Sequence, residues 1–420
     1  MTEPAPTPPP GCPAHGDTAH GDAAPLYGPR FQTDPGQVFQ ELRERYGPVA
    51  PVEIGGGVPA WLVLGYRELQ LVTGQPAVFG RDSRRWNAWP SIPADWPLTP
   101  MVAPLPSVLY TEGEEHRRRA GAITDALAEV DPYEVRKHCE ELADRLVDEF
   151  AGRGESDLVA EYADRLPLLV LCRLFGFGED RAPGMISAIL DVLDGGPAAL
   201  DGQQRMVDDM VRLVASKHEA PGADVTSRML AHPAGLSDEE LMRDLTVLML
   251  AGHQPTANWI SNALRLMLTD DRFASALSGG RRSVGQALNE VLWEDTPTQV
   301  FAGRWTTRDT QLGGRRIAAG DLVLLGLAAA NQDPAVRQAS GRAAEGNNAH
   351  LSFSHGEHRC PFPAQEIAEV ISVTAIEVLL DRLPDIRLAV SEQALVWRPS
   401  AWMRSLVALP AAFTPGAAAG

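Results

Sequence analysis

The sequence lacks several features that mark particular classes of protein. Its 420 residues carry a formal net charge of −18, so it has no surplus of positive charge for nucleic acid or an anionic membrane surface. It contains four cysteines and no C-x-x-C pair, which argues against a disulfide framework or a zinc module. The longest apolar run, residues 322–330, is too short to span a bilayer. We therefore expect a soluble, cytoplasmic protein that binds neither nucleic acid nor membrane.

The two ends of the sequence have little that could form a core. The first residues, MTEPAPTPPPGCPAHG, have neither a basic flank nor an apolar stretch, so we expect neither a signal peptide nor a membrane anchor. Their proline-rich and alanine-rich composition buries too little apolar surface to offset the cost of ordering. We predict a flexible tail over residues 1–30, a single domain over 31–413 and a loose tail over 414–420.

Hydrophobic spacing predicts a mainly helical chain with a small β-rich part. Helical periodicity covers residues 34–46, 66–72, 112–128 and 237–268. The last of these opens with a capping box, Ser237 and Glu240, and its length predicts that it crosses the core. Strands over 49–54 and 60–64 flank a glycine run and predict a hairpin, and further strands are expected over 311–330.

A proline-rich stretch over residues 80–110 also contains three tryptophans, Trp86, Trp89 and Trp96. Long loops in compact proteins are usually functional or disordered, and the tryptophans argue against disorder. Two interpretations stay open: the loop lines a substrate pocket, or the indoles fasten it to the surface.

The strongest candidate site is the stretch LSFSHGEHRCPFPAQEIA, residues 351–368. Four of its residues have the spacing F-x-x-G-x-H-x-C: Phe353, Gly356, His358 and Cys360. The text after Cys360 is helical, and Pro361 suits a first helical position, so we expect the helix to begin at Cys360. Free N–H groups and the helix dipole would favour the thiolate there, which is the form that binds metal. The alternative is a buried, inert cysteine after an ordinary turn.

This spacing resembles the haem-binding loop of the cytochrome P450 family. The resemblance implies that the Cys360 thiolate is the axial ligand of haem iron, with haem b (iron protoporphyrin IX) as the cofactor and with Phe353, Gly356 and His358 beside it. It also implies the family fold, mainly α with a small β-rich subdomain. The implied reaction inserts one oxygen atom from O2 into a small, mostly apolar organic substrate, with electrons from a ferredoxin and its reductase.

Two further segments resemble the family's contacts to the haem propionates. Glu115 and His116 match the first two residues of E-H-x-x-x-R, but the arginine position is Ala120, and Arg119 lies one residue away. Arg304 stands where family members have a propionate-binding arginine, whose planar fork binds a carboxylate through two contacts. We therefore expect His116 and Arg304 at the cofactor.

Three consecutive arginines follow His116: Arg117, Arg118 and Arg119. They are either a solvated helix face or, because the rest of the protein is acidic, a docking site for an acidic electron donor.

Residues 251–256, AGHQPT, resemble the family's oxygen-binding stretch A-G-x-[D/E]-T-T. Gly252 is thus expected beside the cofactor, while Gln254 and Pro255 replace the usual acid and threonine. Pro255 lacks an N–H and crowds the carbonyl of Ala251, so we expect a widened turn whose free carbonyl holds a water. A kink with only a packing role is the alternative. We assign catalytic roles to Thr256, Gln254 and Ala251, with Thr256, water on the Ala251 carbonyl or a substrate hydroxyl carrying protons.

Glu290-Val-Leu-Trp293 stands in place of the family's E-x-x-R, with Trp293 at the arginine position. Counting from the N-x-D-P match at residues 331–334 puts Arg342 at the family's loop arginine. Burying an unpaired carboxylate is costly, so we predict that Glu290 pairs with Arg342 while Trp293 fills the vacated volume. A solvated Glu290 is the alternative.

The replaced acid and threonine also leave two other functions open. One is a peroxide-using or rearranging haem-thiolate enzyme, and the other is a haem-binding non-enzyme such as a sensor or sequestering protein.

Overall fold

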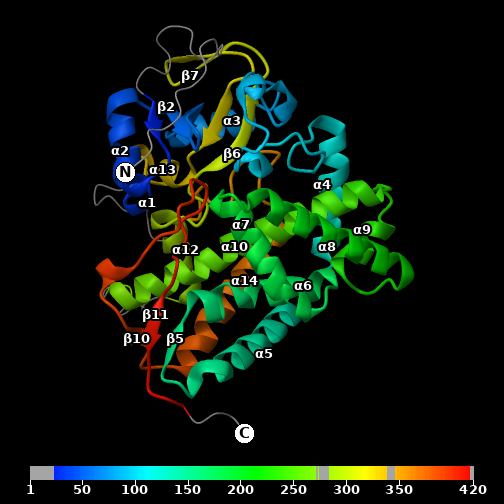
Figure 1. Ribbon diagram of the computed structural model, residues 1–420, viewed down its shortest axis with the longest axis vertical. Helices are drawn as coiled ribbons and strands as arrows, with labels where there is room; N and C mark the ends of the chain where they lie inside the picture. The colour runs from blue at the N-terminus through cyan, green and yellow to red at the C-terminus, as the bar shows by residue number, and fades with distance from the viewer. Residues whose placement is uncertain (1–22, 271–272, 274–282, 338–345, 417–420) are drawn as a thin grey trace.

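The computed structural model describes residues 23–270, 273, 283–337 and 346–416. It has a β-rich part, at the top of Figure 1, and a larger helical part below it. The longest helix, α10 (Asp238–Thr269), lies across the middle of the molecule in Figure 1. The expected fold, mainly α with a small β-rich subdomain, is confirmed.

The main sheet has six strands in the order β1-β2-β3-β9-β6-β4. Its strands are β1 (Ala24–Pro25), β2 (Val49–Ile54), β3 (Val58–Val63), β9 (Leu322–Leu325), β6 (Phe301–Thr306) and β4 (Phe79–Gly80). β2 and β3 form the predicted antiparallel hairpin, and β3 continues parallel to β9. β6 lies antiparallel to both β9 and β4, so it brings the segment after β4 beside Gly303 and Arg304.

Four short helices accompany this sheet: α1 (Pro29–Thr33), α2 (Pro35–Tyr46), α3 (Tyr66–Gly74) and α13 (Leu327–Asn331). Two smaller sheets complete the β structure. One has the strands β5 (Glu155–Asp157), β11 (Pro410–Ala412) and β10 (Arg387–Leu388), and the other is the hairpin β7 (Thr310–Leu312) and β8 (Arg315–Ile317).

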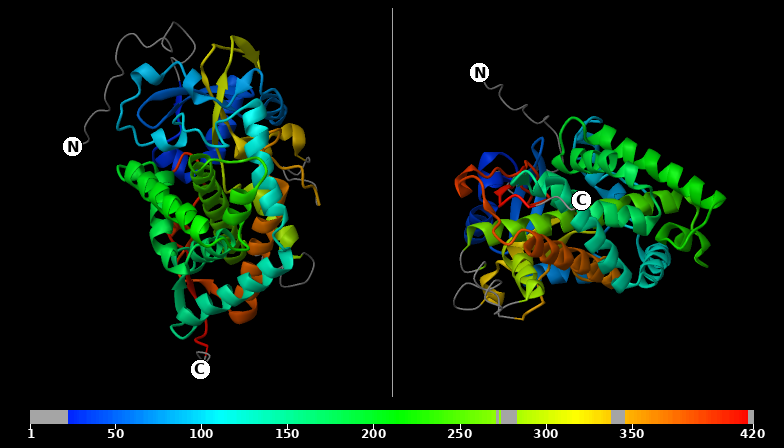
Figure 2. Two further views of the ribbon diagram at one scale, coloured as in Figure 1. Left: turned by 90° about the vertical axis from the view of Figure 1, so that its right-hand side faces the viewer. Right: turned by 90° about the horizontal axis from the view of Figure 1, so that it is seen from below.

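The helical part is packed around α10 and α14 (Phe362–Arg382). Its other helices are α4 (Gly113–Ala128), α5 (Pro132–Ala151), α6 (Arg165–Phe175), α7 (Ala182–Asp194), α8 (Ala199–Glu219), α9 (Val225–Ala231) and α12 (Val284–Glu294). Figure 2 shows α14 against α5 from two further directions, in agreement with their extensive packing. No helix among the described residues is long and apolar enough to cross a membrane.

The sequence of α10 explains why it passes through the interior. Both hydrogen bonds of the predicted capping box, between Ser237 and Glu240, are present at its start. Every residue from 256 to 264 is buried, including the polar Asn258, Ser261 and Asn262. A helix that is buried on all sides needs neighbours all round it, and α6, α8, α12 and α14 pack against it.

Three expectations about element boundaries were wrong. Residues 23–30, which we had assigned to a flexible tail, belong to the fold, because β1 pairs with β2 and α1 follows directly. Residues 414–416, which we had assigned to a loose tail, are held in place, because Thr414 and Gly416 donate hydrogen bonds to Asp385 and to the Ala151 carbonyl. The strands expected over 311–330 are present as β7, β8 and β9, but they end at Leu325, because Gly326 turns the chain into the short helix α13.

The tryptophans of the 80–110 loop fasten it to the β-rich part. The Trp96 indole donates to the Gly55 carbonyl in the β2–β3 turn at 2.7 Å, and the Trp89 indole donates to Ser83 at 2.6 Å. Trp86 packs between them, with ring centroids 5.0 Å from Trp89 and 6.0 Å from Trp96. The fastening interpretation therefore accounts for all three indoles.

Candidate functional site

The cysteine-bearing loop is shaped by two left-handed residues. Ser354 has φ 62° and Gly356 has φ 78°, and the Cys360 N–H donates to the Phe353 carbonyl at 3.0 Å. A Cβ at Gly356 would lie 2.2 Å from the Thr73 carbonyl oxygen, so only glycine fits. The backbone at Gly356 thus lies close to the end of α3, where the Thr73 hydroxyl also lies 3.1 Å from His355 Nδ1.

Helix α14 begins at Phe362, two residues later than predicted, with Pro361 as its N-cap residue. The expectation that the helix start favours a Cys360 thiolate was wrong for the polypeptide alone. Pro361 and Pro363 carry no N–H, so the first turn has few donors to offer. Burial then dominates and raises the pKa of the Cys360 thiol from 9.0 to about 12. A cation bound at the sulfur is needed to keep the thiolate.

Asn331, at the end of α13, ties this loop to α12. Its amide donates to the Leu292 carbonyl at 2.9 Å and to the Ser352 hydroxyl at 3.0 Å, and its carbonyl accepts the Leu351 N–H at 2.7 Å. The side chain is fully buried. A satisfied buried amide of this kind makes the loop more rigid.

Aromatic rings support the loop from two helices. The Phe353 ring lies 6.0 Å from Trp259 of α10, edge to face, and 5.7 Å from His350. His350 in turn lies 6.1 Å from Trp293 of α12. One row of aromatic rings therefore connects the cysteine loop with α10 and with α12. These are the two helices in which the chain departs from the family pattern.

His116 and His358 lie together, as the cofactor assignment requires. Their ring centroids are 3.8 Å apart, and His116 Nδ1 is 3.1 Å from the Val108 carbonyl. His358 Nδ1 is buried without a hydrogen-bond partner among the described residues. Burial, with Arg81 and His116 nearby, lowers the pKa of His358. The His358 imidazole is thus neutral rather than cationic.

Arg304 on β6 is almost completely buried, and it has a cationic neighbour that we did not predict. Arg81, the residue after β4, is also fully buried. Its guanidinium donates to the Leu109 carbonyl at 2.6 Å and to the Gly303 carbonyl at 2.6 Å. Burial lowers the pKa of both arginines, that of Arg81 to about 10, and Arg81 adds to the effect on Arg304. Two buried cations side by side call for an anion.

The arginines after His116 are not a solvated face. Arg119 is fully buried and paired with Asp244 of α10, and Arg118 is paired with Glu240. Arg117 alone is largely exposed, with its guanidinium 3.6 Å from Glu357. Arg119 is therefore committed to α10 and does not replace the arginine that the family pattern would put at position 120.

The middle of α10 differs from our expectation. The helix continues without a widened turn through Pro255, although the Ala251 carbonyl still lacks the N–H that a proline removes. The Thr256 hydroxyl donates to the Gly252 carbonyl at 2.7 Å and so supports this turn. Ala251 is exposed, whereas a Cβ at Gly252 would lie 3.2 Å from Leu171 of α6. Gly252, assigned to the cofactor, faces α6 in the structure.

Gln254 belongs to a buried polar group on the α6 side of α10. Its amide donates to Asn258 Oδ1 at 2.9 Å, and His253 Nε2 lies 2.7 Å from the Asp164 carbonyl. The Asp164 carboxyl is buried here, and burial raises its pKa to about 6, against the opposing effects of Arg398 and Gln254. An acid is thus present near Gln254, and it comes from the N-cap position of α6 and not from α10.

The Glu290–Arg342 ion pair remains a prediction, because Arg342 lies outside the described residues. Trp293 is buried, and its indole donates to the Asn347 carbonyl at 2.7 Å. Arg337 lies over the Trp293 ring, 5.5 Å from its centroid, and donates to the Trp293 and Asn331 carbonyls at 3.0 and 2.6 Å. Arg337 is therefore the described arginine that stabilises the end of α12.

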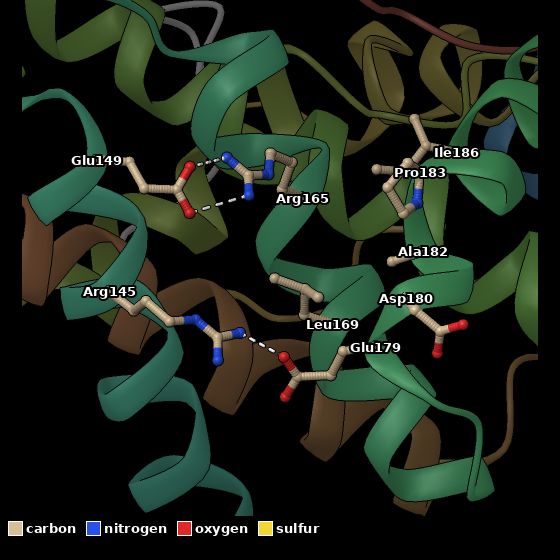
Figure 3. Close-up of a pocket in the computed structure, with 9 residues that line it drawn as sticks. All are labelled: Arg145, Glu149, Arg165, Leu169, Glu179, Asp180, Ala182, Pro183 and Ile186. Carbon is tan, nitrogen blue, oxygen red and sulfur yellow. Dashed lines mark hydrogen bonds and ion pairs between the residues drawn. The ribbon is translucent and has the colours of Figure 1, made fainter.

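A hollow between α5, α6 and α7 lies outside this site (Figure 3). Glu149 is paired with Arg165, and Arg145 is paired with Glu179 across it, as the dashed lines in Figure 3 show. Four of its five charged groups are paired in this way, and none of its lining residues comes from the cysteine loop, α10 or the sheet.

The convergent residues fit a haem. No group of three or more His, Cys, Asp or Glu among the described residues could hold a metal by itself, so a metal at Cys360 would bring its other ligands with it. The haem supplies four nitrogen ligands and two carboxylates. Arg81 Nη2 and His358 Nδ1, both buried and without partners in the described chain, are donors that such carboxylates would satisfy.

Comparison with known proteins gives one family at full length. The chain is 30% identical over 396 residues to cytochrome P450 107B1 of Saccharopolyspora erythraea, covering 92% of this chain and 96% of that one. It is 29% identical over 414 residues to vitamin D(3) 25-hydroxylase of Pseudonocardia autotrophica, covering 94% and 97%. The solved structure of CYP154C4 from Streptomyces sp. W2061 superposes with a TM-score of 0.86, at 25% identity over 95% and 99% of the chains. No protein-family model matches the chain.

Proposed function

The chain belongs to the cytochrome P450 family of haem-dependent monooxygenases, and on that premise we propose which residues do the work and on what class of substrate. Haem b is held with Cys360 as the iron ligand. The bound haem supplies the activation of O2, and the thiolate assists by releasing electron density towards the iron. The observation that supports this assignment is the convergence of Cys360, His358, His116 and Arg304 from three separate parts of the chain.

The protein residues bind and orient. His116, His358 and Arg304 hold the carboxylates of the haem, and Phe353, fixed by Trp259, keeps the cysteine loop in place. Thr256 holds a proton on its hydroxyl, 2.7 Å from the Gly252 carbonyl, and can pass it to a water on the Ala251 side. Gln254 has no acidic proton to give and instead orients its neighbours Asn258 and Asp164.

The substrate is a small, mostly apolar organic molecule. Leu248, Ala251 and Pro255 share one face of α10, and each of them keeps part of its surface exposed. Such a face offers apolar contact and no charged group. The relative named as a vitamin D(3) 25-hydroxylase acts on a compound of this general character.

Electrons arrive from a ferredoxin and its reductase, in the cytoplasm. Arg117 and Arg359, on α4 and in the cysteine loop, are exposed basic residues close to Cys360 in an acidic protein. An acidic donor would meet complementary charge at this point.

Turnover under two conditions tests the proposal. We expect product from an apolar substrate with ferredoxin, its reductase and a nicotinamide donor, and loss of product in Cys360→Ser. Product with peroxide and none with the reductase system would favour the peroxide-using alternative. Substrate binding without product under either condition would favour a haem-binding sensor. The relatives, named as a P450 and a hydroxylase, do not favour these two alternatives.

A further inference from the structure

Arg81 is a buried cation whose contacts satisfy only part of its guanidinium. The side chain is fully buried. It donates to three backbone carbonyls, those of Leu109, Ala302 and Gly303, but Nη2 has no partner among the described residues. Carbonyl dipoles do not neutralise a buried charge, which needs an anion.

The nearest carboxylate does not serve this need. Glu112 accepts the Arg81 backbone N–H at 2.5 Å, and both of its oxygens bind the Arg85 guanidinium at 2.8 Å. Arg304, the buried arginine beside Arg81, has one hydrogen bond among the described residues, to the Gly303 carbonyl at 3.1 Å. Within the described chain, neither guanidinium forms an ion pair with an acid.

The backbone around Arg81 is arranged to hold the guanidinium in this place. β4 pairs with β6 so that Gly80 lies opposite Trp305, which brings Arg81 beside Gly303 and Arg304. Gly303 has φ 106°, and a Cβ there would lie 2.6 Å from Arg81 Nη1. The guanidinium also lies over the rings of Tyr110 and Phe301, 5.4 and 5.3 Å from their centroids. These contacts fix its plane and direction.

We propose that Arg81 is a cofactor-anchoring residue, whose guanidinium together with that of Arg304 binds a carboxylate of the haem in place of an arginine on α4. Ala120 occupies the α4 position, and Arg119, next to it, is consumed by Asp244. Arg81, which follows β4, thus supplies the positive charge that α4 lacks at position 120. This inference rests on the proposed haem-binding function.

Haem loss from the full-length holoprotein tests the proposal. Haem transfer to an excess of apomyoglobin is timed for the wild type and for Arg81→Gln. Hydrogen bonds between two charged groups are strong, so removing one should weaken haem binding. We expect the Arg81→Gln variant to lose haem roughly tenfold to a hundredfold faster than the wild type. The matched control is Arg84→Gln, three residues along the chain, whose side chain is 78% exposed and paired with Asp82. We expect its rate to stay within about twofold of the wild type.

Haem dimethyl ester separates a direct contact from a structural one. With both carboxylates capped, Arg81→Gln and wild type should lose the cofactor at the same rate. A gap that persists with the ester would show that Arg81 acts through the fold and would overturn the proposal. Haem loss at the wild-type rate from Arg81→Gln would also overturn the proposal. It would do so even if the variant bound a carboxylic-acid ligand such as myristic acid more weakly than the wild type does.

Failure of the proposed function gives a different result. If the wild type shows no thiolate spectrum with haem, the haem-thiolate assignment itself is wrong. If the wild type shows that spectrum and Arg81→Gln loses haem at the wild-type rate, only the role of Arg81 is wrong.

Discussion

Arg119 of α4 and Asp244 of α10 form a fully buried ion pair, with two guanidinium nitrogens 2.9 and 2.6 Å from the two carboxylate oxygens. Asp244 also accepts the Val108 N–H at 2.6 Å, so the loop before α4 is held at the same point. Because α4 carries His116, this pair sets the position of a proposed cofactor residue against the central helix. It also explains why an arginine next to the family position is not free to bind the cofactor.

Asp244→Asn should destabilise the protein by about 3–5 kcal/mol, because it leaves the Arg119 charge buried without its partner. Urea unfolding of the holoprotein measures the change. The control is Arg118→Gln, whose partly exposed pair with Glu240 should contribute about 1 kcal/mol or less. Equal effects of the two variants would contradict the dominant role of the buried pair.

Asp164→Asn should raise stability at pH 7.5 and leave it nearly unchanged at pH 4. Burial raises the pKa of Asp164 from 3.8 to about 6, so the folded protein holds a proton that the unfolded chain releases between these values. Stability is therefore lost as the pH rises through this window, by up to roughly 3 kcal/mol at about 1.4 kcal/mol for each pKa unit.

Urea unfolding of Asp164→Asn and wild type at both pH values measures this difference. Asp208→Asn, at an exposed position on α8, is the control and should show no pH-dependent difference from the wild type. A gain for Asp164→Asn that is the same at both pH values would rule out the titration.

Pro361→Leu should raise the reduction potential of the bound haem. Position 361 follows the ligand directly, and its proline has no N–H to donate to the sulfur. A restored hydrogen bond of about 1.4 kcal/mol corresponds to roughly 60 mV for one electron. Redox titration with optical detection gives the value. A lower potential in the variant would mean that the backbone at 361 does not face the sulfur.

Thr256→Val should lower the amount of product formed for each electron consumed, because it removes the hydroxyl group and its proton. The Thr256 hydroxyl oxygen lies 2.7 Å from the Gly252 carbonyl oxygen. A positioned proton donor contributes about 10²-fold or more, and we expect a loss of roughly 10- to 100-fold in coupled turnover. Thr256→Ser keeps the hydroxyl and should recover most of it. Unchanged coupling in Thr256→Val would leave the proton route to water or to a substrate hydroxyl.

Much of the fold followed from local sequence signals. The capping box of α10 is present as predicted. The β2–β3 hairpin and the helices α2 and α4 begin and end within two residues of their predicted bounds. These elements depend on residues close together in the chain. β1 was missed because a two-residue strand that includes a proline has no periodicity, and its pairing with β2 is visible only in three dimensions.

The candidate site could be predicted where its residues lie in one segment with a characteristic spacing. It could not be predicted where residues from distant segments meet. Phe353, Gly356, His358 and Cys360 lie in one loop, so their spacing alone identified them. Arg81 lies more than 200 residues from Arg304, and only the pairing of β4 with β6 brings the two together. The helix after Cys360 begins two residues later than predicted, and burial, which the sequence does not give, raises the pKa of the Cys360 thiol.

The carbon-monoxide difference spectrum of the reduced protein tests the central assignment most directly, since it reports the ligand opposite carbon monoxide and needs no substrate. We expect the spectrum of thiolate-ligated haem from the wild type and its loss in Cys360→Ser. The same spectrum from Cys360→Ser, or a wild type that binds no haem on reconstitution, would contradict the assignment of Cys360.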